Sequence, residues 1–330
     1  MIRRVWRAFA TFVTILVLGL IAIELVARYG LGLGDPPLSQ NHPTIEYMLQ
    51  PGRTYHRFGN EYRVNAYSMR SDPFPDQKSH PDERRVMVFG DSIVNGGNIT
   101  DQSELATELL RHRLRQKTGG PVVIGNISSG SWGPQNQLAY LRQFGLFDAD
   151  LAVLVFGAAD LEDVPKHELT AGFSASHPAS TPPTALHEAW TRYLPRYVPW
   201  LEGDRPPSPS MKTIINQQPE YKHATVALLR LCEEITAQGV PLILALHPTR
   251  DAFEAGRHET AFEVIDAAAA LPGVDFVDLL PRYRASTTDA SMYRDALHLR
   301  AAGQRILAEA LQPEIEKRLG LASEDAPPQR

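Results

Sequence analysis

Cysteine is almost absent from this chain, since Cys232 is the only one among 330 residues. An intrachain disulfide is therefore impossible even in an oxidising compartment, and zinc sites built on cysteine are excluded. Cys232 lies in an amphipathic helical pattern, ALLRLCEEI, which predicts a core position rather than a nucleophile.

A strong excess of charge of one sign is also lacking. The chain has 33 Lys and Arg residues against 38 Asp and Glu residues, a formal net charge of −5. We find no basic tract with interleaved aromatic residues and no internal repeat. The composition therefore gives no reason to expect nucleic acid as a partner. It is that of an ordinary globular protein, long enough for one large domain with insertions or for two small ones.

One long hydrophobic run is present, close to the N-terminus. Arg3, Arg4 and Arg7 precede an apolar stretch from Ala8 to Ile23. That length is near the lower limit of a membrane span and exceeds most signal-peptide cores. The arginines favour a cytoplasmic N-terminus, so residues beyond about 30 would face the periplasm. We expect residues 1–30 to be a single-pass anchor in the inner membrane, with a cleaved signal peptide or a buried soluble helix as alternatives.

The remaining chain divides by composition into a lead-in, a main domain and a tail. Residues 31–84 are expected to be a linker and lead-in segment, whose first part, GLGDPPLSQNHPT, is a Pro/Gly-rich spacer. Residues 85–320 are expected to form the main domain, and residues 321–330 a disordered tail. An insertion at residues 165–215 is rich in proline, serine and aromatics. Its aromatic residues either cap a binding site or pack in a small cluster of their own: Trp190, Tyr193, Tyr197 and Trp200.

Within the main domain, short apolar strands alternate with helices. Strands are predicted at 86–90, 122–128, 151–157, 240–248 and 274–280. Helices are predicted at 101–117, from Pro134, near 220–238 and at about 300–318. This alternation predicts a parallel sheet covered by helices on both faces. Functional loops then cluster at the carboxyl ends of the strands.

Ser92 stands at one of those strand ends, in VFGDSIVNGG. A serine hydroxyl is a poor nucleophile unless a base takes its proton and donors hold the resulting oxyanion. Asp295 and His298 precede the last predicted helix and are three positions apart. That spacing lets the carboxylate reach one imidazole nitrogen while the other acts as a general base. A phosphate-binding loop is disfavoured, because the glycine spacing of such loops is missing.

Four segments occur in the order and approximate spacing of the SGNH (GDSL-type) hydrolase family. They are GDS at 90–92, the glycine-containing strand end after Asn126, GAAD at 157–160 and DALH at 295–298. The chain resembles membrane-anchored bacterial members of this family over most of residues 85–318. The resemblance implies a three-layer α/β/α flavodoxin-like SGNH hydrolase fold with a parallel sheet, preceded here by a transmembrane helix. It also implies serine acyl-ester chemistry without a cofactor or a metal.

Position by position, the resemblance assigns three catalytic roles. Ser92 matches the nucleophile, His298 the base and Asp295 the acid that orients it. The backbone N–H groups of Ser92 and Gly130 match the oxyanion hole, and Gly133 is the alternative glycine. LHPTRDAF (246–253) is similar to a segment of alginate acetyltransferase-like proteins. Its His247 and Arg250 either contact substrate or belong to a solvated loop.

The third block departs from the family pattern. Ala159 stands where the oxyanion-binding asparagine belongs, and losing one such donor typically costs about 10²–10³ in turnover. Either another amide substitutes, or the enzyme is slow, or the site no longer catalyses. The candidate amides are Asn95, Asn98, Asn126 and Asn136. The acidic residues nearby favour a solvated loop face over a metal site: Asp160, Glu162 and Asp163.

We therefore expect a periplasm-facing serine esterase or O-acyltransferase with an atypical oxyanion hole. We expect its partners to be an acyl-ester substrate, free or polysaccharide-linked, and the inner membrane. The alternative is a catalytically degenerate binding or assembly protein of an envelope polysaccharide system. Ala159 favours that alternative, whereas the presence of Ser92, Asp295 and His298 together argues against it.

Overall fold

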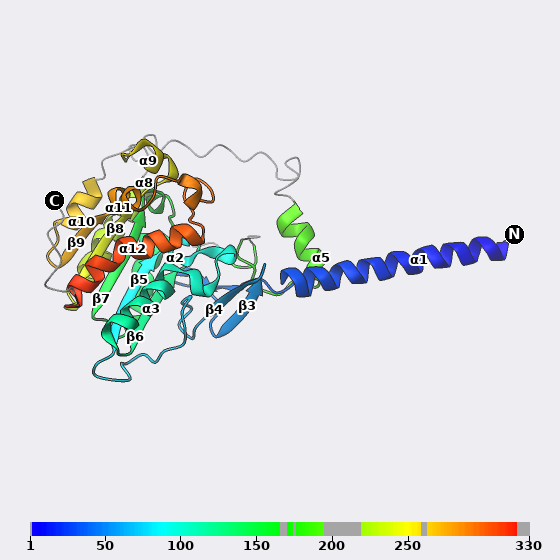
Figure 1. Cartoon of the computed structure of the whole chain (residues 1–330), viewed down its shortest axis with the longest axis horizontal. Coiled ribbons are helices and arrows are strands. Elements are labelled where there is room, and N and C mark those ends of the chain that lie inside the picture. The colour runs from blue at the N-terminus through cyan, green and yellow to red at the C-terminus, as the bar shows by residue number, and fades with distance from the viewer. Residues whose placement is uncertain (1, 166–169, 174–175, 195–218, 259–262, 322–330) are drawn as a thin grey trace.

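The computed structural model describes residues 2–165, 170–173, 176–194, 219–258 and 263–321. The chain begins with the helix α1 (Ile2–Leu25), which continues into the π-helical turn η1 (Val26–Gly30). No residue of α1 is buried, and the helix projects from the domain as a rod (Figure 1). By length and composition it could cross a membrane.

A five-stranded parallel sheet forms the centre of the domain, in the order β6-β5-β7-β8-β9. The strands are β5 (Arg84–Gly90), β6 (Val122–Ser128), β7 (Leu151–Gly157), β8 (Leu242–His247) and β9 (Val274–Asp278). The strand order reverses between β5 and β7. The chain first places β6 on one side of β5, and then continues on the other side with β7, β8 and β9. In sheets of this flavodoxin-like order, ligands bind outside the carboxyl ends of the strands at such a point.

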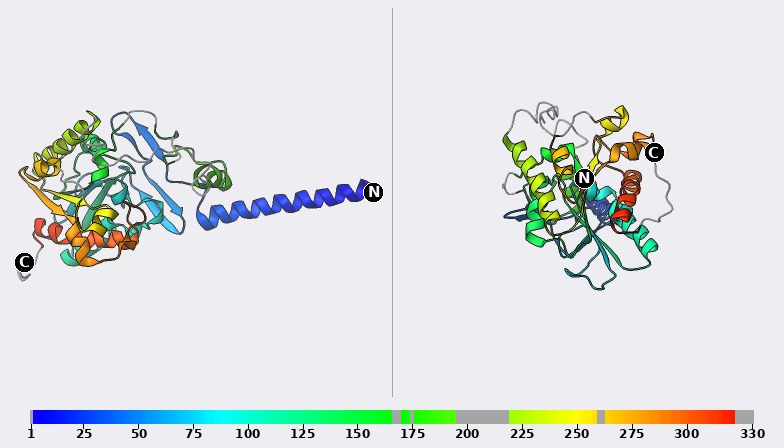
Figure 2. Two further views of the ribbon diagram at one scale, coloured as in Figure 1. Left: turned by 90° about the horizontal axis from the view of Figure 1, so that it is seen from above. Right: turned by 90° about the vertical axis from the view of Figure 1, so that its left-hand side faces the viewer.

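Helices cover both faces of this sheet, because alternate strand residues point to opposite sides. One face packs against α4 (Pro134–Phe144), α8 (Pro219–Thr236) and α10 (Glu263–Ala269). The other packs against α3 (Ala106–Thr118), α11 (Leu279–Ser286) and α12 (Ala301–Arg318). The right-hand view of Figure 2 shows the sheet between these layers. The predicted three-layer fold is confirmed.

Short helices fill the connections between these elements. They are α2 (Ser92–Asn95), η2 (Gly97–Ile99), η3 (Gln102–Glu104), η4 (Ala158–Leu161), α5 (Ala185–Glu188), η5 (Ala189–Tyr193), α9 (Arg250–Ala255) and η7 (Ala290–Met292). Cys232 is buried on α8, as its helical pattern indicates. Apart from Leu321, the tail predicted to be disordered lies outside the described residues.

The lead-in differs from the expected spacer and irregular segment, since it folds into two antiparallel hairpins. β1 (Ser39–His42) pairs with β2 (Glu46–Leu49), and β3 (Arg53–Arg57) pairs with β4 (Asn60–Val64). These strands are short and mostly polar, so their composition conceals them. With Leu38, which precedes β1, their inward positions nevertheless form a small core: Leu49, Tyr55, Tyr62 and Val64.

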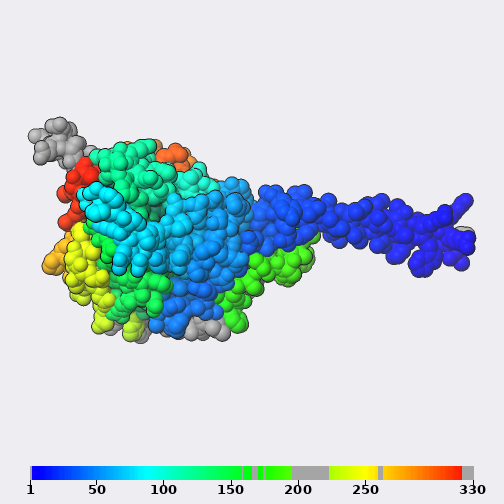
Figure 3. All heavy atoms as spheres, turned by 90° about the horizontal axis from the view of Figure 1, so that it is seen from below, coloured from blue at the N-terminus to red at the C-terminus, as the bar shows by residue number. Residues whose placement is uncertain are grey.

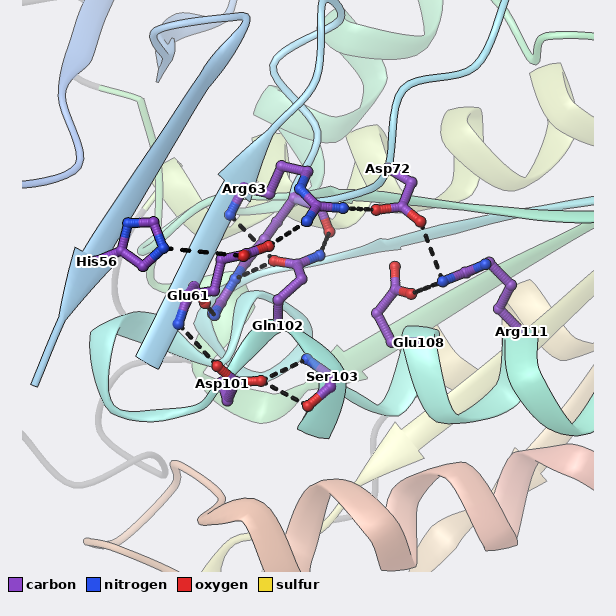
Figure 4. A network of polar contacts seen from close by, with 10 residues as sticks. His56, Glu61, Arg63, Asp72, Asp101, Gln102, Ser103, Glu108 and Arg111 are labelled. Carbon is purple, nitrogen blue, oxygen red and sulfur yellow. Dashed lines mark hydrogen bonds and ion pairs between the residues drawn. The ribbon is translucent and has the colours of Figure 1, made fainter. Parts of the chain in front are cut away.

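Charged groups bind the second hairpin to the domain (Figure 4). Asp101 accepts a hydrogen bond from the Glu61 backbone N–H at 2.7 Å. Asp72 pairs with Arg63 of the hairpin and with Arg111 of α3. The lead-in is therefore part of the folded domain and does not act as a spacer.

Candidate active site

Ser92 is the first residue of α2, directly after β5. Asp91 caps this short helix, because its carboxylate accepts a hydrogen bond from the Ile93 N–H at 2.8 Å. Position 90 requires a glycine for steric reasons, because a Cβ there would lie 2.3 Å from Cγ2 of Val94. The turn thus presents the Ser92 hydroxyl at the carboxyl end of the sheet.

A hydrogen-bonded chain connects the three residues predicted to be catalytic. Ser92 Oγ lies 2.8 Å from His298 Nε2. Nδ1 of the same ring lies 2.9 Å from both carboxylate oxygens of Asp295. The structure therefore brings together a serine and an aspartate 203 positions apart in sequence, in the geometry of a nucleophile, a base and an orienting acid.

The local fold also keeps Asp295 ionised. Its Oδ1 accepts backbone hydrogen bonds from Leu297 at 3.0 Å and from His298 at 2.8 Å. Partial burial raises the pKa of Asp295, but these hydrogen bonds and the imidazole outweigh it and hold the pKa well below its usual range. A charged Asp295 fixes the imidazole tautomer whose Nε2 accepts a proton from serine.

His247 holds the loop that carries His298, which corrects both sequence-based alternatives for His247. It is buried at the end of β8, with Nδ1 3.1 Å from the Tyr283 hydroxyl and Nε2 3.2 Å from the Leu297 carbonyl. Burial lowers its pKa to about 4, so it remains neutral. Arg250 is exposed, and its backbone N–H donates to the Ala296 carbonyl of the same loop at 2.8 Å. The strand pattern alone does not reveal this support, because it depends on β8 lying next to the loop.

The two candidate oxyanion glycines differ in what their N–H groups do. The Gly133 N–H donates to Asn136 Oδ1 at 3.1 Å, and a Cβ on Gly133 would lie 2.1 Å from the Asp163 carbonyl oxygen. Gly133 is thus required for close packing at the start of α4. Among the described residues, the N–H of Gly130 has no hydrogen-bond acceptor, and Gly130 lines the same pocket as Ser92. Tyr47 of β2 holds the Gly130 peptide by donating to its carbonyl.

Asp160 is fully buried, which makes the expected solvated loop face wrong at this position. Its carboxylate accepts the Gly157 N–H at 2.8 Å and lies within hydrogen-bonding reach of Asp91. Burial and the Asp91 charge raise the pKa of Asp160 well above its usual value, so Asp160 carries the proton shared by the pair. Burial and nearby carboxylates raise the pKa of Asp163 to about 7. Within the described part of the chain, no cluster of residues suits a metal ion.

The four amides considered as substitutes for the missing asparagine separate clearly. The side-chain NH₂ groups of three of them already donate to backbone carbonyls: Asn95 to Ser128, Asn126 to Val94 and Asn136 to Ile45. Asn98 lines the pocket, and its side chain makes no hydrogen bond to the described residues. Ala159, in η4, is not one of the pocket-lining residues.

The pocket at Ser92 has a volume of about 270 Å³, and segments outside the sheet form much of its wall. The lead-in contributes Pro37, Ser39, Leu49 and Tyr62, and the insertion contributes Ser176, His177 and Arg192. The insertion's aromatic residues do not line the pocket where the structure describes them. Trp190 is exposed and Tyr193 packs on Phe58, while Tyr197 and Trp200 lie outside the described residues.

A buried arginine of the lead-in shapes the loop after the nucleophile. Arg70 donates to the carbonyl oxygens of Asn95, Gly97 (2.7 Å) and Thr100 (2.5 Å). Its guanidinium carbon lies 4.0 Å from the centre of the Tyr62 ring. The sequence does not reveal this role of Arg70, because its acceptors are backbone carbonyls that only the folded loop brings together.

The chain is similar to known hydrolases in sequence pattern and in fold. The sequence model of the GDSL-like lipase/acylhydrolase family matches residues 88–306, from β5 into α12. No curated protein matches the chain. Among solved structures, TesA is 16% identical with a TM-score of 0.44, over 71% of this chain and 99% of that chain. A lipase/acylhydrolase from Enterococcus faecalis is 17% identical with a TM-score of 0.43, over 71% and 96%. A catalytic mutant of Axe2, an acetylxylan esterase from Geobacillus stearothermophilus, is 13% identical with a TM-score of 0.42, over 72% and 94%.

Proposed function

The chain belongs to the GDSL-like lipase/acylhydrolase family of esterase-type hydrolases, and we propose that it is a membrane-anchored serine esterase or O-acyltransferase whose catalytic domain faces the periplasm. The observation that carries this proposal is the hydrogen-bonded chain from Ser92 through His298 to Asp295. A fold retained only for binding has no need to keep all three groups in contact.

The reaction follows from this geometry. Ser92 Oγ attacks the acyl carbonyl while His298 Nε2 takes its proton, and Asp295 stabilises the imidazolium that forms. His298 then returns the proton to the departing alkoxide, which leaves an acyl group on Ser92. Water, or a hydroxyl of an acceptor sugar, attacks this acyl-enzyme with His298 again acting as the base. The first outcome is hydrolysis and the second is acyl transfer.

The negative charge that develops on the carbonyl oxygen needs donors. We assign two of them to the backbone N–H groups of Ser92 and Gly130, since Gly130 lines the pocket and its N–H is unused among the described residues. We assign a third to the amide of Asn98, in place of the asparagine that Ala159 replaces. One such donor is worth about 10²–10³ in turnover.

The N-terminal helix supports the anchoring part of the proposal. The distance along α1 and η1 from Arg7 to Arg28 is about 31 Å at 1.5 Å per residue, close to the thickness of the hydrocarbon core. Cleavage after Ala27 would remove Glu24, whose carboxylate accepts hydrogen bonds from the Ala185 and Leu186 N–H groups. An uncleaved helix retains both hydrogen bonds. Mass spectrometry of the protein from membranes tests this point, and a mature N-terminus near residue 28 would contradict it.

Labelling with a serine-reactive fluorophosphonate tests the catalytic part. We expect the native protein to be modified at Ser92, and Ser92→Ala to remain unlabelled. His298→Ala should also lose labelling while its circular dichroism and melting temperature stay close to native. If the folded native protein resists the probe, or if Ser92→Ala is labelled equally, the binding-protein alternative that Ala159 favours takes its place.

A further inference from the structure

The end of α1 is bound directly to the insertion that lines the pocket. The carboxylate of Glu24 accepts hydrogen bonds from the Ala185 N–H at 2.8 Å and the Leu186 N–H at 2.9 Å. These are the first N–H groups of α5, which have no acceptor within the helix itself. Arg28 Nη2 donates to the same carboxylate at 3.0 Å. A charged group inside an apolar helix thus finds its partners in α5 and in the next turn of its own helix.

A second set of contacts keeps this junction rigid. Glu188, at the end of α5, forms a buried ion pair with Arg57 of β3 and accepts the Gly34 N–H at 2.6 Å. Arg57 also donates to the Tyr193 hydroxyl at 3.0 Å. Residues on both sides of the junction share a small apolar core, in which Ala27 packs with Ala185. The helix, the second hairpin and the insertion therefore form one body at the base of α1.

The position of Glu24 along the helix determines how near α5 lies to a bilayer. If Arg7 and Arg28 stand at the two membrane surfaces, Glu24 is one turn, about 6 Å, inside the outer one. The first turn of α5 is hydrogen-bonded to Glu24 and would then lie at the headgroup boundary. Figure 3 shows the green surface of the insertion directly against the base of the blue helix.

The side chains exposed around this base suit a membrane boundary. Trp190 of η5 is 68% exposed, while its neighbours Ala189 and Tyr193 pack inward. Phe58, at the tip of the second hairpin, is partly exposed beside Tyr193, and Leu31 is exposed where its carbonyl accepts the Phe58 N–H. Tryptophan and other amphipathic side chains concentrate at the headgroup level of membranes.

A groove beside α5 shares one lining residue, Arg192, with the catalytic pocket. It has a volume of about 340 Å³ and runs past α5, lined by Phe173, four prolines that include Pro36, and Arg192. Arg192 also lines the pocket at Ser92, and Pro37 does so directly after Pro36. The groove and the Ser92 pocket therefore adjoin at Arg192.

We propose that α5 and η5 (Ala185–Tyr193), together with Phe58, rest on the outer surface of the bilayer and hold the Ser92 pocket against it. The ester then reaches Ser92 from the membrane, as an amphiphile whose apolar chain stays in the lipid while its polar ester enters along the groove. This rests on the proposed membrane anchoring and esterase activity. It adds a second membrane contact and names the substrate class.

Lipid quenching tests the surface contact in the full-length protein. Trp190→Cys, labelled with a bimane fluorophore and reconstituted into phosphatidylethanolamine–phosphatidylglycerol vesicles, should lose at least half of its fluorescence when the lipids carry a doxyl quencher near the headgroup. The native Cys232 is buried, so labelling is confined to position 190. Phe276→Cys is the matched control, since Phe276 is also an exposed aromatic but lies on β9, far from α1 (Figure 1). Equal quenching at the two positions, or none at 190, would overturn the proposal.

An activity comparison tests the route of the substrate. With full-length protein in vesicles, Trp190→Ser should lower kcat/KM at least fivefold for p-nitrophenyl palmitate dissolved in the bilayer. Hydrolysis of water-soluble p-nitrophenyl acetate should stay within twofold of native, and Phe276→Ser should change neither. Equal effects on both esters, or no effect on either, would refute the membrane route. If the native protein hydrolyses neither ester, the esterase function fails and the route with it, whereas quenching at 190 still decides the surface contact.

Discussion

The five-stranded core and the segments that cover its carboxyl edge contribute differently to one site. Ser92 follows β5, Asp295 and His298 precede α12, and hydrogen bonds connect the three side chains. The wall around Ser92 comes largely from outside the core, with Tyr62 from the lead-in and Arg192 from the insertion. The core thus holds the serine, histidine and aspartate, while the added segments line the pocket around them. Substitutions in the two regions should therefore affect different quantities.

The largest effect is expected in the core. Ser92→Ala removes the nucleophile and should lower kcat on p-nitrophenyl acetate by about 10⁴-fold or more, while the melting temperature changes little. Ser286→Ala on α11 is a matched control, since it also removes one serine hydroxyl, and Ser286 is exposed and does not line the pocket. Initial rates and thermal unfolding of the two variants provide the comparison. Substantial activity in Ser92→Ala would place the chemistry elsewhere.

The next effect lies on the loop that follows the nucleophile. Asn98→Asp keeps the size of the side chain but removes its N–H donor, so kcat should fall by about 10²-fold with little change in KM. Ala159→Asn restores an amide at the position where the family carries one. In the Asn98→Asp background it should recover roughly tenfold or more of the lost rate. Steady-state kinetics of both variants decide the assignment, which fails if Asn98→Asp retains native kcat.

A smaller effect distinguishes two tyrosines of the same hairpin. The Tyr62 hydroxyl donates to Asn95 Oδ1 at 2.9 Å, beside the nucleophile, whereas the Tyr55 hydroxyl accepts the Leu38 N–H at 3.1 Å. Each change to phenylalanine should cost about 1 kcal/mol of unfolding free energy. Only Tyr62→Phe should also lower kcat/KM, by roughly three- to tenfold. Denaturant unfolding and ester kinetics test this, and equal activity of the two variants would show that the hairpin does not position the site.

The smallest effect concerns stability rather than rate. Asp160 keeps its proton in the folded state at a pH where the unfolded chain releases it, because burial raises its pKa. Its contribution is fully present below the unfolded pKa of about 3.9 and is lost as pH rises toward the folded pKa. The side-chain amide introduced by Asp160→Asn can still accept a hydrogen bond from the Gly157 N–H and donate one to the Asp91 carboxylate. Its melting temperature should exceed the native value by roughly 3–6 °C at pH 8 and match it near pH 4.

Thermal unfolding of Asp160→Asn between pH 4 and pH 9 gives this comparison. Asp163, whose pKa is raised to about 7, remains in both proteins, so its titration is present in both melting profiles. Parallel melting profiles for the native protein and the variant would contradict the protonated state of Asp160.

The strands of the core could be predicted from the sequence, whereas the segments that cover its carboxyl edge could not. The strands β6 and β7 agree with the predicted ranges 122–128 and 151–157, since buried parallel strands appear as continuous apolar runs. The hairpins of the lead-in were missed, because their strands have four or five mostly polar residues and become stable only by packing on the domain. Asp160 and His247 were misjudged for a related reason. Their burial depends on neighbours that are distant in sequence.

The sequence by itself determined the parallel α/β core, an apolar N-terminal helix, and the residues Ser92, Asp295 and His298 as one chemical set. Local hydrophobic periodicity marks the strands and helices along the chain. The resemblance to the SGNH family assigns the three residues their common role. Only the tertiary structure decided that Asn98 and Gly130 lie at the pocket, that Arg70 and His247 hold its loops, and that Glu24 joins α1 to the insertion. These contacts join segments tens to more than a hundred residues apart, and only the packing of hairpin, insertion and sheet brings their donors to their acceptors.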